Sequence, residues 1–197
     1  MKYFFLFFAV FIFQTSLVAQ KYFTRTGHVH VHSVNNIMEL DADNYQMNST
    51  FDVATGEVMF VGLIKSFEFD LGLADRLLHN ERISIVDQPK ILFEGEILGL
   101  KGKDLSVAGR HLVTVKGNLY IYGYKRVTSA QGFVRVAEDG TLKAESDFSI
   151  KIEKESVDQI NKLMRDHLPN MLNIDANQLG LSRDIDINVN FTYRPRA

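Results

Sequence analysis

The sequence contains no cysteine, no tryptophan and only three prolines among its 197 residues. Without cysteine, neither a disulfide framework nor a lipid-modified cysteine is available, so stability must come from the core of the fold. Three prolines are too few to mark a linker between domains. The net charge of -2 is small, and lysines and arginines are scattered among acids. Nucleic acid is therefore not an expected partner, because a phosphate backbone requires a clustered basic surface.

The first twenty residues have the layout of a signal peptide. Lys2 precedes an uncharged apolar run from Phe4 to Phe13, which is followed by smaller residues up to Ala19. This run is shorter than the roughly 18 to 20 residues that a membrane-spanning helix needs. We predict a signal peptide over residues 1–20, cleaved near Ala19 or Gln20, and export to the periplasm, with secretion as the alternative. Residues 21–197 are then expected to form one domain.

After residue 21, the strongest pattern is an alternation of apolar and polar residues with a period of two. Such alternation places successive side chains on opposite faces of a β-strand, one buried and one wet. The clearest examples are residues 91–97, 113–121, 142–151 and 185–191. In the segment 113–121, only Gly117 interrupts the apolar row. Each of these segments is predicted to be a strand with one buried face.

Turn sequences separate the predicted strands at residues 54–56, 100–103 and 138–140. Glycine is favoured in such turns because it accepts positive φ without a steric penalty. About eight strands joined in this way predict an all-β protein, and closure into an antiparallel barrel would remove its exposed edges. Residues 71–80 and 156–167 have helical spacing, so one or two short helices are also expected.

Six segments, taken in order, carry a resemblance to a known family. They are Thr26–His30, Glu39–Asn44, Thr55–Phe60, Ile64–Phe69, Asp87–Gly95 and Lys116–Gly123. In this order and spacing they resemble the YceI-like family over about residues 22 to 152. The resemblance implies a lipocalin-like periplasmic barrel, with no catalysis and no cofactor, whose interior holds a polyisoprenoid such as an isoprenoid quinone or a polyprenyl phosphate. The chain departs from the family pattern at residues 78–83 and 124–126 and in a longer segment at 156–169, near the predicted barrel mouths.

Apolar side chains on the predicted strands are candidates for lining a ligand tunnel. The six chosen are Phe60, Phe93, Leu119, Ile121, Phe133 and Phe148. An eight-stranded barrel is wide enough either to be filled by its own side chains or to hold one slender ligand, so an ordinary filled core is the alternative for all six. A phosphate headgroup would require cations at a mouth, for which Lys65, Lys125 and Arg126 are weak candidates. Solvated surface charge is the default role of each.

Three histidines, His28, His30 and His32, share one face of the first predicted strand because they are spaced two residues apart. Imidazoles at this spacing, with a third ligand from elsewhere, could bind zinc. The alternative is a wet face opposite the buried Val29 and Val31. No cysteine or nearby acid cluster completes the set, so no metal is expected and the histidines are weak candidates only.

Enzyme motifs are missing from the sequence. No strand-turn-helix nucleophile elbow surrounds Ser66, and no glycine-rich phosphate loop is found. We therefore expect a non-enzymatic carrier or storage protein that binds an isoprenoid-type lipid and contacts membranes only transiently. A filled-core structural or interaction barrel and a metal-binding barrel are the alternatives, and the oligomeric state is left open.

Overall fold

The computed structural model describes residues 21–34, 39–70, 72, 90–100, 103, 105–121, 124–152, 154, 157–158 and 182–195. The strands are β1 (Lys21–Val34), β2 (Glu39–Asp52), β3 (Glu57–Leu63), β4 (Glu68–Phe69), β5 (Lys90–Leu98), β6 (Gly109–Ile121), β7 (Tyr124–Val136), β8 (Leu142–Lys151) and β9 (Asp184–Pro195). A single-turn 3₁₀ helix, η1 (Ile64–Ser66), lies between β3 and β4.

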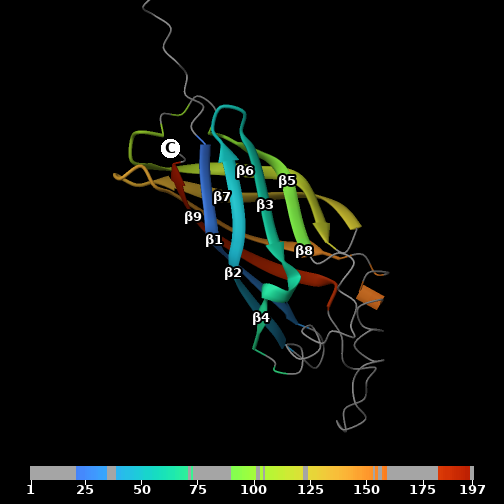
Figure 1. Cartoon of the computed structure of the whole chain (residues 1–197). Helices are drawn as coiled ribbons and strands as arrows, with labels where there is room; N and C mark the ends of the chain where they lie inside the picture. Colours follow the sequence, from blue (N-terminus) through green and yellow to red (C-terminus); the bar gives the residue numbers. More distant parts are fainter. Residues whose placement is uncertain are drawn as a thin grey trace, which may run out of the picture.

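The strands form one antiparallel sheet that closes on itself (Figure 1). Strand β1 pairs with β2 on one side and with β9 on the other. The two-residue β4 pairs with β2 at Ala42 and Asp43, and β3 pairs farther along the same strand. Because β3 and β4 together occupy one place beside β2, the nine elements make an eight-stranded barrel. The predicted lipocalin-like all-β barrel is confirmed.

The predicted turns are also confirmed where they can be followed. Gly56 has φ of 83° and Gly140 has φ of 77°, in the region where glycine carries no steric penalty. The Lys103 N–H donates to the Leu100 carbonyl at 2.9 Å, which closes the third turn. The predicted signal peptide and almost all of the two predicted helices lie outside the described residues. Among the residues described, no helix has the length and apolar character needed to cross a membrane.

The interior is filled at the end of the barrel where β1 begins and β9 ends. Tyr22, Phe51, Leu100, Leu142 and Tyr193 are each at most 2% exposed there. The hydroxyl groups of Tyr193 and Ser49 share a hydrogen bond of 2.7 Å inside this core. Burial raises the pKa of Tyr193 well above its ordinary value, although the Ser49 hydrogen bond opposes this shift. This end of the interior is a closed hydrophobic core.

Aromatic rings pack over glycines at the centre of the barrel. The Phe60 ring stacks on Phe93 with a centroid distance of 5.2 Å and lies 5.0 Å from the Phe191 ring. Phe191 covers Gly27, where a Cβ atom would lie 2.1 Å from its ring. The glycine that interrupts the apolar row of β6, Gly117, likewise leaves room for Phe93. Glycines on the interior rows thus accept rings from neighbouring strands.

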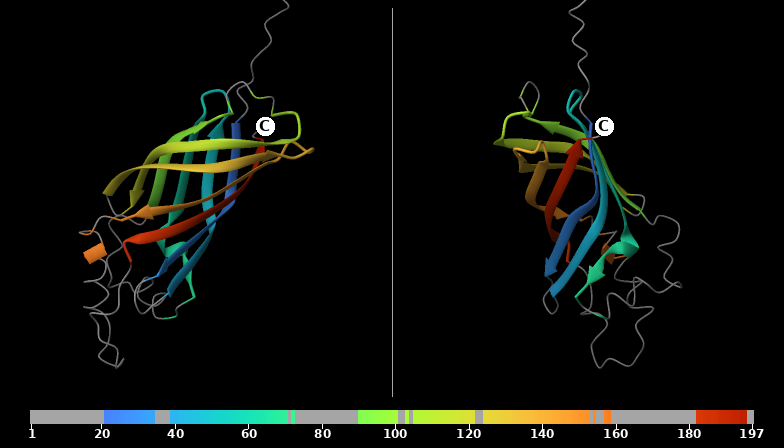
Figure 2. Two further views of the ribbon diagram at one scale, coloured as in Figure 1. Left: turned by 180° about the vertical axis from the view of Figure 1, so that it is seen from behind. Right: turned by 60° about the vertical axis from the view of Figure 1, so that its left-hand side comes forward.

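The ladder between β7 and β8 is short. Within the described residues these strands pair only from Phe133 to Val136, whereas β6 pairs along the whole of β7. Beyond this ladder, the Ser146 hydroxyl of β8 donates a hydrogen bond to the Gln131 carbonyl of β7 at 2.7 Å. Figure 2 shows the two strands diverging toward the end of the barrel where β7 begins. We call the stretch without strand pairing, between residues 124–132 of β7 and residues 146–151 of β8, the β7–β8 seam.

Candidate functional site

Five of the six residues predicted to line a ligand lie on interior rows of the barrel. Phe60 and Phe93 stack at its centre, and Leu119 is the register partner of Phe93. Ile121 continues the Leu119 row to the end of β6, and Phe148 faces Ile187 on the row that borders the β7–β8 seam. Leu119, Ile121 and Phe148 are only partly buried, in contrast to the filled end. That these side chains contact a ligand stays a prediction.

The sixth predicted lining residue, Phe133, lies on the outer surface of the barrel. Its register partners are Leu112, which is 60% exposed, and the exposed Glu145. The Arg110 guanidinium lies 3.5 Å above its ring on the same outer face. The next residue, Val134, is 2% exposed and occupies the interior row instead. The prediction that Phe133 lines the interior is therefore wrong.

The three predicted headgroup cations occupy different surroundings. Lys65 and Lys125 are exposed, and the Lys125 ammonium lies 5.9 Å from the Tyr120 ring. Arg126 is partly buried, and its pairing with Leu119 places it on an interior row of β7 beside the seam. Two residues farther, Thr128 is 7% exposed, and its hydroxyl has no hydrogen-bond partner in the described part of the chain. Sequence reasoning did not select Thr128, because a threonine in a strand is unremarkable.

The three histidines lie on the outer face of β1, opposite carboxylates of β2. His28 and His30 both bond to Asp43, His30 through Nδ1 at 3.1 Å. The Nε2 atom of His30 lies 3.2 Å from Asp41 Oδ1. His32 donates from Nδ1 to the same Asp41 oxygen at 2.9 Å. The expectation that no acids stand near these histidines is thus wrong, since the acids come from the neighbouring strand.

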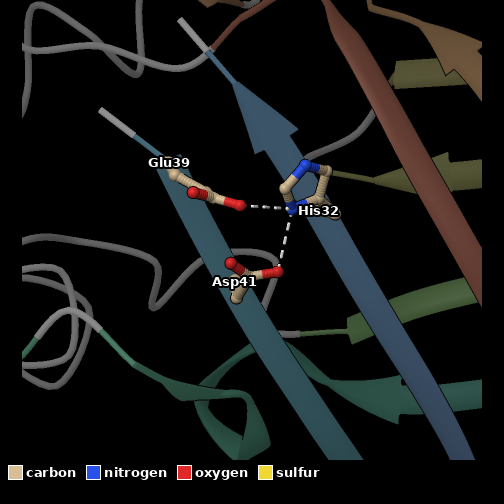
Figure 3. Close-up of side chains that lie close together, drawn as sticks. All are labelled: His32, Glu39 and Asp41. Atoms are coloured by element: carbon tan, nitrogen blue, oxygen red, sulfur yellow. Dashed lines mark hydrogen bonds and ion pairs between the residues drawn. The ribbon is translucent and has the colours of Figure 1, made fainter. Parts of the chain in front are cut away.

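Glu39 completes this group at the end of β2. Its carboxylate lies 3.8 Å from His32 Nδ1, and the ligand atoms of His32, Glu39 and Asp41 all lie within 4.8 Å of one another (Figure 3). The sequence shows that Glu39, Asp41 and Asp43 alternate with the uncharged residues Leu40, Ala42 and Asn44. Read together with the short connection to β1, it could have placed these acids opposite the histidines.

Proton equilibria on this face follow from the same contacts. The hydrogen bond to Asp41 raises the pKa of His32 above its ordinary value, against a smaller opposing effect of burial, and the Asp41, Glu39 and Asp186 charges add to the rise. Burial alone would raise the pKa of Asp43, but the hydrogen bonds and charges of His28 and His30 outweigh it and lower that pKa. His32 therefore keeps its proton to a higher pH, and Asp43 keeps its negative charge to a lower pH, than the isolated side chains do.

Comparisons with known proteins identify the fold. No protein-family profile and no curated protein matches the chain. A polyisoprenoid binding domain from Saccharophagus degradans, implicated in plant cell wall breakdown, matches with a TM-score of 0.69 at 14% identity, over 89% of this chain and 98% of that one. BcnA of Burkholderia cenocepacia matches with a TM-score of 0.54 at 14% identity, over 85% and 96% of the two chains.

The chain shares their fold. This agrees with the barrel architecture that the resemblance to YceI-like proteins implies. At 14% identity, the likeness assigns the architecture and leaves the ligand to the residues of this chain.

Proposed function

We propose that this protein is an exported carrier or storage protein that holds a long isoprenoid-type lipid in its barrel. The observation that carries the proposal is the fold shared with a polyisoprenoid binding domain over 89% of this chain. The interior rows add support, since they are mainly apolar, as ligand pockets are. The signal-peptide layout of residues 1–20 supports export.

The lipid chain occupies the part of the interior beside the β7–β8 seam in this proposal. Ile91, Leu119, Ile121, Phe148 and Ile187 are partly exposed there, whereas interior residues at the other end are almost fully buried. The Phe60–Phe93 stack forms the floor between these two regions. A shorter strand ladder at the seam gives the sheet room to adjust around a slender ligand.

Arg126 and Thr128 are the polar contacts proposed for the headgroup. They stand two residues apart on the interior side of β7, beside the seam. A polyprenyl phosphate would use the charge of Arg126, because guanidinium groups form strong hydrogen bonds with phosphate oxygens. A quinone would require only a donor to a carbonyl oxygen, which the buried hydroxyl of Thr128 supplies.

A filled-core barrel is the second candidate, and the packing at the centre favours it. Met47 occupies the space above Gly62, where a Cβ atom would lie 2.1 Å from its sulfur, and Phe191 does the same at Gly27. Interiors packed in this way exclude a ligand from the centre. The two candidates therefore differ in the part of the barrel beside the seam.

Mass spectrometry of an organic extract tests the proposal. The mature protein is produced by export, purified without detergent and extracted. The carrier proposal predicts co-purified lipids whose masses differ by whole isoprene units. Repeated extraction of no lipid, with an unchanged fold by circular dichroism, would overturn it in favour of the filled-core barrel.

A further inference from the structure

The outer face of β1 and β2 carries a mixed imidazole and carboxylate cluster that lipid binding inside the barrel does not use. His30 and His32 point outward from β1, and Glu39 and Asp41 do so from β2. Antiparallel pairing places His32 directly opposite Asp41, so the backbone register fixes this juxtaposition. Strand neighbours with side chains on one face are held closer and more rigidly than residues on a loop.

The distances in the cluster suit a small transition-metal ion. Asp41 Oδ1 lies 2.9 Å from His32 Nδ1 and 3.2 Å from His30 Nε2, and Glu39 lies 3.8 Å from His32 Nδ1. Zinc bonds to nitrogen and oxygen are about 2.0 to 2.2 Å long, so tetrahedral ligand atoms lie about 3.3 to 3.6 Å apart. The two separations measured from His32, 2.9 Å to Asp41 and 3.8 Å to Glu39, lie on either side of this range, and all three ligand atoms lie within 4.8 Å of one another.

A surface hollow adjoins two of these side chains, His30 and His32. It has a volume of about 270 Å³, and its lining includes His30, His32, Asp147, Asp186 and Asn188. Asn188 donates to Asp147, and Ser149 donates to Asp186, so hydrogen bonds hold the far wall of the hollow. A metal ion held by three protein ligands keeps a further coordination position. Because His32 also lines the hollow, water is expected to fill that position.

From this geometry we infer that His32, Asp41 and Glu39 bind one divalent transition-metal ion of the zinc class, with His30 beside them. The metal replaces the proton that His32 Nδ1 donates to Asp41, because an imidazole nitrogen must be deprotonated to coordinate. His30 is a positioning residue, with its Nδ1 bonded to Asp43 and its Nε2 3.2 Å from Asp41 Oδ1. Glu39 is exposed and His32 and Asp41 are partly exposed, which makes this an exchangeable site and not a structural one.

Isothermal titration calorimetry with ZnCl₂ tests the inference. The mature protein is first stripped of metal with a chelator and freed of any affinity tag. One zinc ion per chain is expected. Calcium is expected to bind far more weakly, because it prefers oxygen ligands and this site includes an imidazole nitrogen. The His32→Ala and Asp41→Asn variants are each expected to weaken zinc binding about 10-fold or more. Cobalt absorbance bands of a nitrogen- and oxygen-liganded ion provide a second measurement.

His28→Ala is the matched control. It removes one histidine from the same face of the same strand but lies outside the three-residue ligand group. Zinc affinity within about 3-fold of wild type is expected, well below the loss from a true ligand. Equal losses in His28→Ala and His32→Ala, or no saturable zinc binding by the wild type, would overturn the inference. The lipid content of the same samples is measured separately. Failure of the metal inference can therefore be distinguished from failure of the lipid-carrier proposal.

Discussion

Gly117 on β6 lies directly against Phe93 on β5, and a Cβ atom at this glycine would lie only 2.7 Å from the tip of the Phe93 ring. The same Cβ would lie 2.2 Å from the Glu94 carbonyl oxygen and 2.6 Å from the Gly95 Cα. Two facing glycines therefore let β5 and β6 approach closely while Phe93 fills the interior above them. The break in the apolar row of β6 has a structural purpose.

Substitution of Gly117 by alanine is expected to destabilise the barrel. The added methyl group would meet backbone atoms that cannot rotate away, and overpacking of this kind costs about 1 to 3 kcal/mol. Gly109→Ala on the same strand is the control, since the nearest atom to its Cβ would lie 3.7 Å away. Urea denaturation should show a lower midpoint for Gly117→Ala only. Equal midpoints for the two variants would contradict the packing described here.

Phe93 and Phe133 should respond differently to truncation, because one lies inside the barrel and the other outside. Phe93 is 7% exposed, so Phe93→Ala is expected to reduce the free energy of unfolding by about 3 to 5 kcal/mol. Phe133 lies on the outer surface and is only partly buried, so Phe133→Ala loses mainly the contact with Arg110, a type of contact worth about 0.5 to 1 kcal/mol at exposed sites. Chemical denaturation of both variants checks the order. A larger loss at Phe133 would mean that β7 is inserted with the opposite face inward.

Stability is expected to fall at alkaline pH because of Tyr193. Its pKa in the folded state is raised by burial, above an unfolded value of about 10. The stability that Tyr193 contributes is therefore fully present below about pH 10 and is lost as the pH rises from there toward the folded pKa. Tyr193→Phe should reduce this loss, despite a lower stability at neutral pH from the unpaired Ser49 hydroxyl. Tyr45→Phe, at a 53% exposed position, should leave the alkaline profile unchanged.

Arg126 should distinguish between the two proposed headgroups. Arg126→Gln is expected to lower the loading of a polyprenyl phosphate about 10-fold, because the charge-assisted hydrogen bond is lost, and to leave quinone loading within about 2-fold. Lys125→Gln removes the same charge from the adjacent, exposed position and is the control. Loading is measured by extraction of reconstituted protein. A similar loss in both variants would assign the effect to general surface charge.

Strands with a clean alternation could be predicted from the sequence, and β7 shows where this reasoning fails. Its interior row contains Arg126, Thr128 and Gly132, whereas Val127, which is 79% exposed, and Phe133 lie outside. Val134 and Val136 are buried on the same row and Arg135 is exposed, so the period-two pattern of β7 holds near its end and is exchanged only at these few positions. An apolar side chain in a predicted strand indicates an interior position for Phe133, and only the pairing with β6 shows that it points outward.

The histidine face shows a different limit. Three imidazoles on one strand face were visible in the sequence, but the ligand set depends on the register between β1 and β2. Asp41 and Asp43 are separated from the histidines by 9 to 15 positions. Pairing register is set by the whole hydrophobic pattern and by the turn, so the carboxylates are found only when the two strands are considered as a pair.

The ratio of bound lipid to protein in an Ile121→Trp variant tests the central claim most directly. Ile121 lies at the end of β6 in the part of the interior proposed to hold the lipid, so an indole there should block the chain while the filled end keeps the fold. Phe133→Trp, on the outer surface, is the matched control. The account predicts wild-type lipid content in Phe133→Trp and at least about a 10-fold loss in a folded Ile121→Trp protein. Equal lipid content in the two variants would contradict it.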